Sequence, residues 1–315
     1  DRHRRSIVCI REDHSLKGRE ESETLVRLGL EGDDGGQVLV SGNDFYWTPR
    51  LSPDGTHLAW ITWNHPSMPW DETELWIGEI KSDGSLGNAE LVAGGPDESI
   101  FQPEWSPDGV LHFVSDRTGW ANFYRWRNGR VEPLYEMEAE FGMDGGMLGM
   151  STYAFHSSDC IICIYRQQGI WHLASLDTRN KKLERIETPY IEMWSVREAA
   201  GHIVFGAGSP TEPGSIVQFD PDSGQFEVLH QFSPVEIDPG YLSNPQAVEF
   251  PTEHERTAYG LYYAPKNRDF EAPYGERPPL LVLVHGGPTG HAFTTLRLDI
   301  QYFTSRGIAV YDVNF

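Results

Sequence analysis

Most of the chain alternates short apolar stretches with turn-forming residues, a pattern that predicts β-strands joined by hairpins. Residues 47–63 (WTPRLSPDGTHLAWITW) and 101–116 (FQPEWSPDGVLHFVSD) share Pro-x-x-Ser-Pro-Asp-Gly, and their first prolines, Pro49 and Pro103, are 54 positions apart. The third and fourth strands of these two units are expected at residues 74–80, 89–95, 122–128 and 131–137. Repeats of this length, with several short strands each, are typical of β-propeller blades.

The shared Ser-Pro-Asp-Gly motif has the chemistry of a tight turn. Pro53 presets φ at the first corner, Asp54 bonds to nearby backbone, and Gly55 takes a positive φ. The second copy repeats this order of residues. Serine and aspartate next to each other invite a catalytic interpretation, but turn formation accounts for them.

Two later segments, residues 151–187 and 193–229, lack the motif but keep four predicted strands each. Ahead of all these units, residues 6–13, 23–32 and 36–42 resemble the last three strands of a blade. The sequence therefore predicts a mainly β fold, with four propeller blades and most of a fifth over residues 1–240. A closed propeller usually has more blades and does not begin within one, so we expect the natural protein to continue before residue 1.

The pattern changes after about residue 240. Residues 245–267 predict a hairpin of longer strands, and residues 279–285 predict a fully apolar strand. A helix is expected from about Thr294 to Ser305, with Leu296, Ile300 and Phe303 on one face and Gly307 at its C-terminal cap, followed by a strand over 308–315. Strand, helix and strand in this order predict that residues 241–315 begin an α/β-hydrolase domain with a parallel sheet.

Composition narrows the classes of function. The formal charge of −22 disfavours nucleic acid, because phosphate binding needs a basic surface. Solubility accounts for most of this charge; the alternative is that an acidic interior attracts cations such as a peptide's free amine. No apolar run approaches the length of a membrane span, and no signal peptide is visible, so we expect no membrane partner. Three cysteines form no disulfide framework, which favours the cytoplasm.

Cys160 and Cys163 form a C-x-x-C pair, which raises the question of a metal or redox site. Their neighbours in DCIICIYR are apolar and β-branched, so the segment predicts a strand, in which positions three apart point to opposite faces. No second Cys/His pair lies nearby to complete a zinc site. We therefore interpret both cysteines as core residues and expect no metal and no cofactor.

The segment His285-Gly286-Gly287-Pro288 follows the apolar strand and has a specific chemical use. When a serine attacks an amide, the carbonyl oxygen becomes an oxyanion, which preorganised backbone N–H groups stabilise. Glycines let a substrate approach the backbone closely, and proline has no N–H, so Gly286 and Gly287 remain as donors within the motif. The alternative is that the two glycines only turn the strand toward the helix.

Taken together, the repeated blades, residues 65–76, 98–109 and 115–126, and PLLVLVHGGPTG (279–290) followed by YFTSRGIAVYDVNF (302–315) resemble the prolyl oligopeptidase superfamily of serine peptidases, in particular its acylaminoacyl-peptidase-like branch. This resemblance implies a propeller that caps an α/β-hydrolase domain and acts as a size filter. It also implies cleavage of short peptides or N-acylated amino acids through an acyl-enzyme, by a Ser, Asp and His triad without metal or organic cofactor.

The sequence departs from the family pattern in one decisive respect. No Gly-x-Ser-x-Gly occurs in the 315 residues, and the family's nucleophile, acid and base all follow the His-Gly-Gly-Pro segment. Only the oxyanion strip can be carried over: Gly287 as N–H donor, Gly286 as its neighbour, and His285 and Pro288 as residues that shape the loop. We therefore expect residues 1–315 alone to be inactive.

Weaker candidates lie in the predicted propeller. The loop NHPSMPWDE is long for a hairpin and carries His65, Met68 and Trp70, which we propose as substrate-contacting residues. The alternative is that Trp70 packs on its own blade. His65 with Asp71 and a serine would not make a triad, because no strand-turn-helix elbow supports it. Glu98, in a link between blades, is a candidate for binding a substrate's amine, with solvation as the alternative.

A second class of function remains open from the sequence. The protein would then be a non-catalytic β-propeller that binds a partner, with a degenerate hydrolase-like tail. An inactive relative could keep His-Gly-Gly-Pro, so the 315 residues do not separate this hypothesis from the peptidase. The sequence also leaves open a homo-oligomer.

Overall fold

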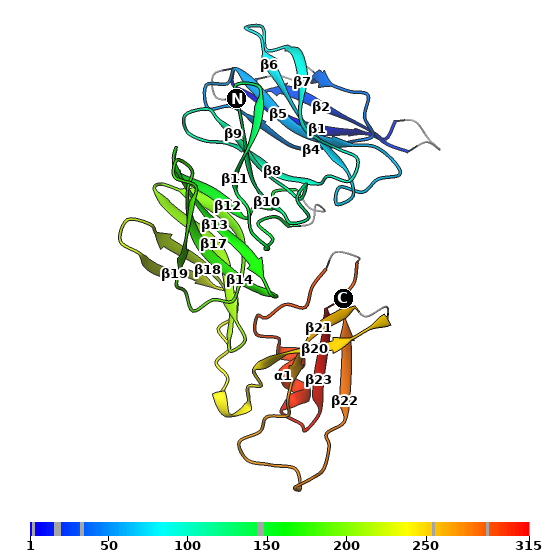
Figure 1. The fold of residues 1–315 in the computed structure, drawn as a ribbon, viewed down its shortest axis with the longest axis vertical. Helices are drawn as coiled ribbons and strands as arrows, with labels where there is room; N and C mark the ends of the chain where they lie inside the picture. The colour runs from blue at the N-terminus through cyan, green and yellow to red at the C-terminus, as the bar shows by residue number, and fades with distance from the viewer. Residues whose placement is uncertain are drawn as a thin grey trace. The chain divides into compact units, whose positions relative to one another are not determined.

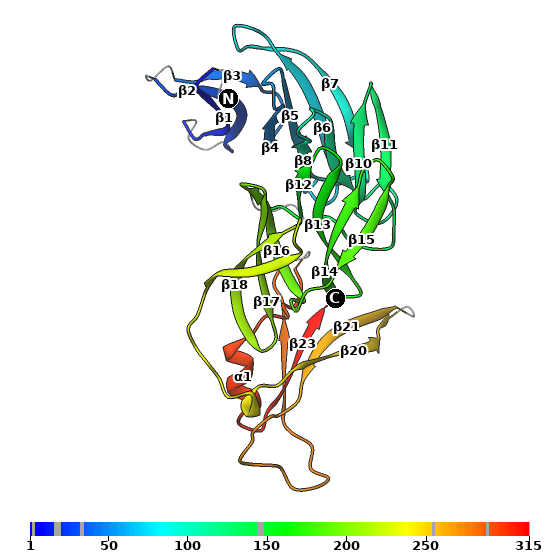
Figure 2. The same cartoon turned by 90° about the vertical axis from the view of Figure 1, so that its left-hand side faces the viewer.

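A computed structural model describes residues 1, 4–15, 20–31, 35–143, 148–253, 256–287 and 290–314. The chain divides into two compact units (Figures 1 and 2). Unit 1 comprises Asp1–Ile186 and Ser195–Ile203, and unit 2 comprises Glu187–Trp194 and Val204–Phe315. Each unit is described separately below. Among the described residues, no helix is long and apolar enough to cross a membrane.

The sheets follow the predicted blade pattern. β1 (Ser6–Asp13), β2 (Ser22–Gly29) and β3 (Gln37–Val40) form a three-stranded sheet. The next two sheets contain β4 (Phe45–Leu51), β5 (His57–Trp63), β6 (Thr73–Ile80) and β7 (Leu86–Gly95), then β8 (Ile100–Trp105), β9 (Leu111–Ser115), β10 (Asn122–Arg127) and β11 (Arg130–Tyr135). In each sheet the strands pair in chain order, as a propeller blade requires.

Two further four-stranded sheets complete the series. They contain β12 (Tyr153–Ser157), β13 (Cys160–Gln167), β14 (Ile170–Asp177) and β15 (Lys182–Ile186), then β16 (Glu192–Ala199), β17 (His202–Ser209), β18 (Glu212–Asp220) and β19 (Gln225–Gln231). The prediction of four blades and most of a fifth is therefore confirmed.

Aromatic side chains fill the core of unit 1. Phe123 is fully buried, with its ring centroid 4.9 Å from that of Phe141 and 5.0 Å from that of Tyr153. The buried side-chain amide of Gln102 also forms hydrogen bonds within this apolar core. The Gln102 side chain donates to the Tyr153 carbonyl at 2.7 Å and accepts from the Thr152 N–H at 2.7 Å. Paired buried polar groups of this kind fix how β8 and β12 meet, whereas an unpaired amide would cost stability.

The Ser-Pro-Asp-Gly turns form as their residue types predict. The Ser52 hydroxyl donates to Asp54 Oδ1 at 2.6 Å and accepts from the His57 N–H at 2.9 Å. Gly55 has φ +69°. The second copy repeats the bond, with Ser106 donating to Asp108 at 2.6 Å. The serine and aspartate of this motif are thus occupied in closing hairpins.

We expect Ser52→Ala to destabilise the propeller by roughly 1–2 kcal/mol, because it leaves the His57 N–H without its acceptor and removes one of three donors to Asp54 Oδ1. Hydrogen bonding, first from Ser52, lowers the pKa of Asp54 from 3.8 to about 2. The lowered pKa means that this contribution is present above pH 3.8 and is lost as the pH falls through about 2. Thermal unfolding as a function of pH measures both effects.

Ser85→Ala is the matched control, since Ser85 donates the same bond to Asp83 at 2.6 Å in another hairpin turn. We expect the control to lower the melting temperature less than Ser52→Ala does. Equal losses would mean that the bond from His57 adds nothing.

The prediction that both cysteines are core residues holds for Cys163 but not for Cys160. Cys163 is buried on β13, its thiol lies 3.7 Å from the Ala174 carbonyl oxygen, and burial raises its pKa. Cys160 is half-buried, with its sulfur 3.4 Å from the Ser175 hydroxyl. Among the described residues, no group of three or more His, Cys, Asp or Glu side chains is placed to hold a metal ion.

A different topology begins after the last blade. The predicted hairpin is β20 (Pro245–Pro251) with β21 (Thr257–Tyr263), and the apolar strand is β22 (Leu280–Val284). The sheet order is β20-β21-β23-β22, in which β23 (Ala309–Asn314) runs parallel to β22 and antiparallel to β21. Ile300 and Phe303 of α1 (Leu298–Thr304) pack in one cluster with Leu281 and Leu283 of β22. Figure 1 shows α1 next to β23. This is the expected start of an α/β-hydrolase sheet.

The helix prediction was wrong at its N-terminal end. The periodicity predicted a helix from about Thr294, but α1 begins at Leu298, and Arg297 before it is extended. The N–H groups of Ala292 and Thr294 bind the side chains of Asn314 and Glu192 instead. Tertiary contacts thus override the local helical pattern.

The boundary predicted near residue 240 falls between β19 and β20, at a short 3-10 helix, η1 (Pro239–Tyr241). The two compact units group the chain differently, because unit 2 holds most of the last blade together with the α/β sheet. The boundary at 240 stays a prediction.

Candidate functional site

The segment predicted to be an oxyanion strip, residues 285–288, follows the carboxyl end of β22. Gly287 has φ +76°, a conformation that side chains rarely adopt. A β-carbon built on Gly286 or Gly287 would meet no atom of the described residues within 4 Å, so no described residue fills the space beside them. Among the residues that the structure describes, none accepts a hydrogen bond from either N–H. The strip therefore offers two backbone donors next to space for a ligand. Pro288 lies outside the described residues.

The segment after the strip folds back against it. A β-carbon on Gly290 would lie 2.7 Å from the Gly286 carbonyl oxygen and 2.9 Å from His285 Nδ1. Both distances are too short for real contacts, so only glycine fits at position 290. His285 therefore lies against the returning segment, and its role in shaping the loop stays a prediction.

A buried carboxylate holds the returning segment. Glu192, at the start of β16, is buried, and its Oε2 accepts from both the N–H and the hydroxyl of Thr294 at 2.9 Å. Its Oε1 lies 3.4 Å from His291 Nε2. All three residues belong to unit 2. A side chain of the last blade therefore fixes the segment that packs against the oxyanion strip.

The C-terminal strand fixes the same segment from the other end. Asn314 of β23 accepts from the Ala292 N–H at 2.6 Å. The Thr294 N–H binds Glu192, so two side chains bind N–H groups two residues apart in the segment 290–297. The extended course of this segment follows from these bonds.

A buried acid lies deeper on β23. Only 4% of the Asp312 side chain is exposed, and its Oδ2 is 3.6 Å from Arg297 Nη1. Burial raises the pKa of Asp312, while the positive charge of Arg297 opposes the shift. Burial also raises the pKa of nearby Tyr263 to about 12. We interpret Asp312 as a structural partner of Arg297, because no hydroxyl nucleophile with a histidine base is assembled at this place among the described residues.

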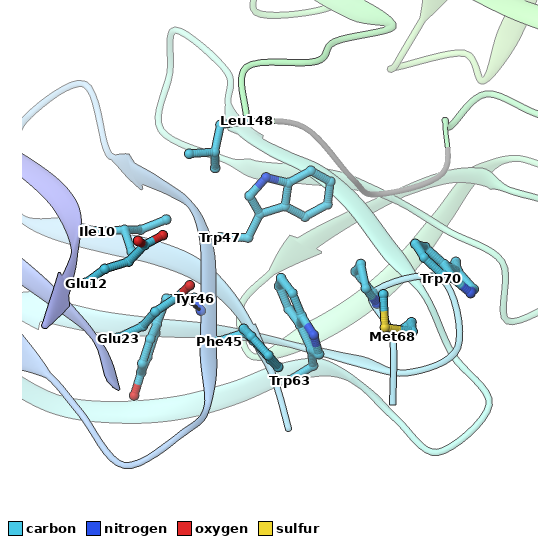
Figure 3. A pocket seen from close by; sticks show the side chains of 11 residues that line it. Ile10, Glu12, Glu23, Phe45, Tyr46, Trp47, Trp63, Met68, Trp70 and Leu148 are labelled. Carbon is cyan, nitrogen blue, oxygen red and sulfur yellow. Dashed lines mark hydrogen bonds between the residues drawn. The ribbon is translucent and has the colours of Figure 1, made fainter. Parts of the chain in front are cut away.

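A separate pocket of about 750 Å³ lies in unit 1 (Figure 3). Its lining is mostly aromatic or apolar, with two carboxylates: Ile10, Glu12, Glu23, Phe45, Tyr46, Trp47, Trp63, Met68, Pro69, Trp70 and Leu148. Met68 and Trp70, predicted to contact substrate, both line this pocket. Whether they touch a substrate stays a prediction.

His65 and Glu98 lie outside the pocket lining. The His65 ring packs edge-on against Phe45, 4.8 Å between centroids, and is exposed to solvent. The Glu98 carboxylate accepts from the Ser115 hydroxyl at 2.6 Å and from Arg117 Nη2 at 2.6 Å. These contacts hold the link before β8, and they give no support to a role for Glu98 in binding a substrate's amine.

The sequence did not predict several residues around the glycine segment and in the pocket of unit 1. Glu12 and Glu23 become neighbours only through the pairing of β1 with β2. Glu192 meets Thr294 across 102 positions of chain. The alternation of β1 and β2 could have placed Glu12 and Glu23 on the face of Ile10 and Leu25. No local signal marks Glu192.

Comparisons with known proteins agree with this architecture. The chain resembles, over 98% of its length, the structure of a Mycobacterium tuberculosis puromycin-hydrolyzing peptidase, with 33% sequence identity and a TM-score of 0.93. It resembles a puromycin hydrolase over 99% of its length, with 33% identity and a TM-score of 0.92. In each case it covers 49% of the other chain, so it spans about half the length of these proteins.

A more distant likeness concerns the fold alone. Prolyl oligopeptidase B from Galerina marginata, bound to a 25mer macrocyclization substrate, matches 98% of this chain with a TM-score of 0.76 but only 10% identity. The match covers 44% of that protein. No protein-family model and no curated protein matches the chain.

Proposed function

Because the chain belongs to the prolyl oligopeptidase superfamily of serine peptidases, we propose that it supplies the propeller and the first part of the catalytic domain of a peptidase that cleaves short peptides. The observation that carries this proposal is the pair of glycines at the end of β22, with open space beside both. The similarity to puromycin-hydrolysing peptidases supports amide hydrolysis as the reaction class.

In this proposal, a serine supplied by the rest of the protein attacks the substrate carbonyl and forms an acyl-enzyme, which water then hydrolyses. The N–H of Gly287, with Gly286 beside it, binds the oxyanion of each tetrahedral intermediate. Donors held in place before the reaction lose little energy to reorganisation, which is why such sites are effective. Glu192 and Asn314 act as positioning residues, since they hold the segment that packs against the strip.

The substrate class within this proposal is peptides and peptide-like amides, with puromycin as the first compound to try. N-acylated substrates, which the acylaminoacyl-peptidase-like branch would imply, form the alternative class. Comparing hydrolysis of one peptide with and without an N-acetyl group separates the two classes.

A fluorophosphonate probe tests the proposal. We expect the longer protein that contains this chain to be labelled covalently at a serine and to hydrolyse puromycin or a short peptide, with the probe abolishing the turnover. Residues 1–315 alone, which contain no Gly-x-Ser-x-Gly, are expected to show neither labelling nor turnover. A longer protein that is neither labelled nor active would leave the non-catalytic binding module as the better hypothesis.

A further inference from the structure

Two arginines lie opposite each other at the turn between β10 and β11 (Figure 2). β10 ends at Arg127, β11 begins at Arg130, and the two residues are direct partners in the strand pairing. Asn128 and Gly129 between them have φ +51° and +72°, as the tight turn of a two-residue hairpin requires. Both arginines are exposed. The hairpin backbone therefore holds two guanidinium groups next to each other.

This arrangement of charge is unfavourable by itself. Like charges directly opposite each other on neighbouring strands destabilise a sheet. Among the described residues, neither Arg127 nor Arg130 forms an ion pair, and neither side chain donates a hydrogen bond. Arg125 differs, because its Nε donates to Glu132 at 3.0 Å and its charge is thereby neutralised. The two arginines at the turn keep both their charge and their donors.

A lysine of the next sheet adds a further positive charge. Lys181, which precedes β15, donates from its Nζ to the Pro133 carbonyl of β11 at 2.7 Å. A hydrogen bond from Arg125 lowers the pKa of Glu132, and the charges of Lys181 and Arg127 lower it further. The positive charge around this carboxylate therefore exceeds what the carboxylate can neutralise.

A buried histidine lies on the same face of the sheet. His112 of β9 pairs with Arg125 of β10, only 2% of it is exposed, and its Nε2 has no hydrogen-bond partner among the described residues. Burial lowers the pKa of His112 to about 4, and the charges of Arg125 and Arg127 add to the shift, whereas Asp108 opposes it. The field of the arginines thus reaches an interior group, which can report on a bound anion.

The chemistry of paired arginines favours one class of ligand. The guanidinium group is planar and always charged, and its fork of N–H donors matches the oxygens of a phosphate group. The chain as a whole carries a formal charge of −22, so most of its surface repels anions. A cluster of unpaired cations is therefore the place where an anion can be held.

We propose that the turn between β10 and β11 binds a doubly charged oxyanion of the phosphate type, held by Arg127 and Arg130, with Lys181 adding positive charge. Free phosphate and a phosphate group on another molecule share this chemistry. The proposal concerns binding only and does not depend on the peptidase activity proposed above.

The probes are inorganic phosphate and N-acetyl-O-phosphoserine amide, each compared with acetate, which carries one charge. The titrations use the full chain at low salt and about pH 8, because a phosphate group loses its second proton near pH 6. We expect saturable binding of both phosphates by calorimetry, with acetate bound at least about tenfold more weakly, a difference of about 1.4 kcal/mol. Added salt should weaken the binding. Tighter binding of the phosphoserine compound would identify a phosphorylated molecule as the ligand, and equal binding would identify the free ion.

Variants locate the site. Arg127→Gln and Arg130→Gln should each weaken phosphate binding about fivefold or more, because each removes a charge-assisted donor. Arg5→Gln is the matched control, since Arg5 is exposed but pairs with Glu31 at 2.7 Å, and we expect no change in phosphate binding. Without phosphate, neither turn variant should melt at a lower temperature than the wild type, because each relieves a repulsion. Phosphate should raise the melting temperature of the wild type more than that of either variant.

The imidazole resonances of His112 give a structural readout, since a bound anion offsets the arginine charges and should raise the pKa of His112. Three results would overturn the proposal. These are equal affinity for phosphate and acetate, unchanged phosphate affinity in both arginine variants, and no saturable binding at millimolar phosphate. Circular dichroism distinguishes a lost site from a lost fold, and if one arginine variant unfolds, the other decides the question.

Discussion

Replacing Gly286 by alanine is expected to remove most of the peptide turnover of the longer protein while leaving its stability unchanged. The β-carbon would meet no atom of the described part of the chain within 4 Å, and Gly286 does not have a positive φ, so we expect no steric clash and no backbone strain. In the proposed reaction the same space holds the substrate carbonyl. A methyl group there moves the oxyanion away from its donors, which costs about 100-fold in kcat/KM by analogy with loss of one oxyanion donor.

Gly287→Ala combines two effects, because this residue also has φ +76°. We expect a stability loss of roughly 1 kcal/mol from the strained backbone, together with a loss of turnover. Gly224→Ala is the matched control: Gly224 has φ +71°, and a β-carbon there also meets nothing within 4 Å. It should lose the same stability and keep full activity.

Steady-state kinetics on puromycin or a short peptide, together with thermal unfolding, measure these variants. Full activity of both Gly286→Ala and Gly287→Ala would show that the glycines serve only to turn the chain, which is the alternative that the sequence left open.

Replacing Glu192 by alanine is expected to destabilise unit 2 strongly. The substitution leaves the buried Thr294 N–H without its acceptor, which costs about 1–3 kcal/mol, and leaves the Thr294 hydroxyl only the Ile191 carbonyl oxygen at 3.5 Å. The segment that Glu192 holds packs against the oxyanion strip through Gly290. We therefore expect a lower melting temperature and also a lower kcat with a smaller change in KM, as for a positioning residue.

Hydrogen exchange at the Thr294 amide gives the more specific readout, since loss of its acceptor should accelerate exchange there before other amides of α1. Glu227→Ala, which removes an exposed carboxylate from β19, is the control. Unchanged exchange at Thr294 in the Glu192→Ala variant would refute the positioning role.

Features that depend on neighbouring residues were predictable from the sequence. The Ser-Pro-Asp-Gly hairpins form because each turn is closed by its own side chains, as the Ser52–Asp54 bond shows. The apolar strand before His285 was also predictable from a local pattern, because five consecutive apolar residues are typical of a strand in a parallel sheet.

Features that depend on distant pairing were not predictable. The helix start was misjudged: Arg297 is extended, and side chains far away in the sequence, Asn314 and Glu192, hold the segment before it. The pocket of unit 1 needs the register of β1 on β2 and the packing of that face near β4, neither of which a local pattern encodes. Of the predicted substrate-contacting residues, only Met68 and Trp70 line it, because that lining depends on how the loop 64–72 folds.

Strand pairing within the blades and in the α/β sheet differs in how far apart the partners lie in the chain, and this difference bears on the order of folding. Each blade pairs strands that follow one another, so loop closure costs little and a blade can form soon after its residues leave the ribosome. In contrast, β21 pairs with β23 after an intervening strand and helix, and Glu192 meets its partner 102 positions later. Such distant contacts form slowly. The oxyanion strip is therefore expected to acquire its geometry only after the blades have folded, with Glu192 solvated until then.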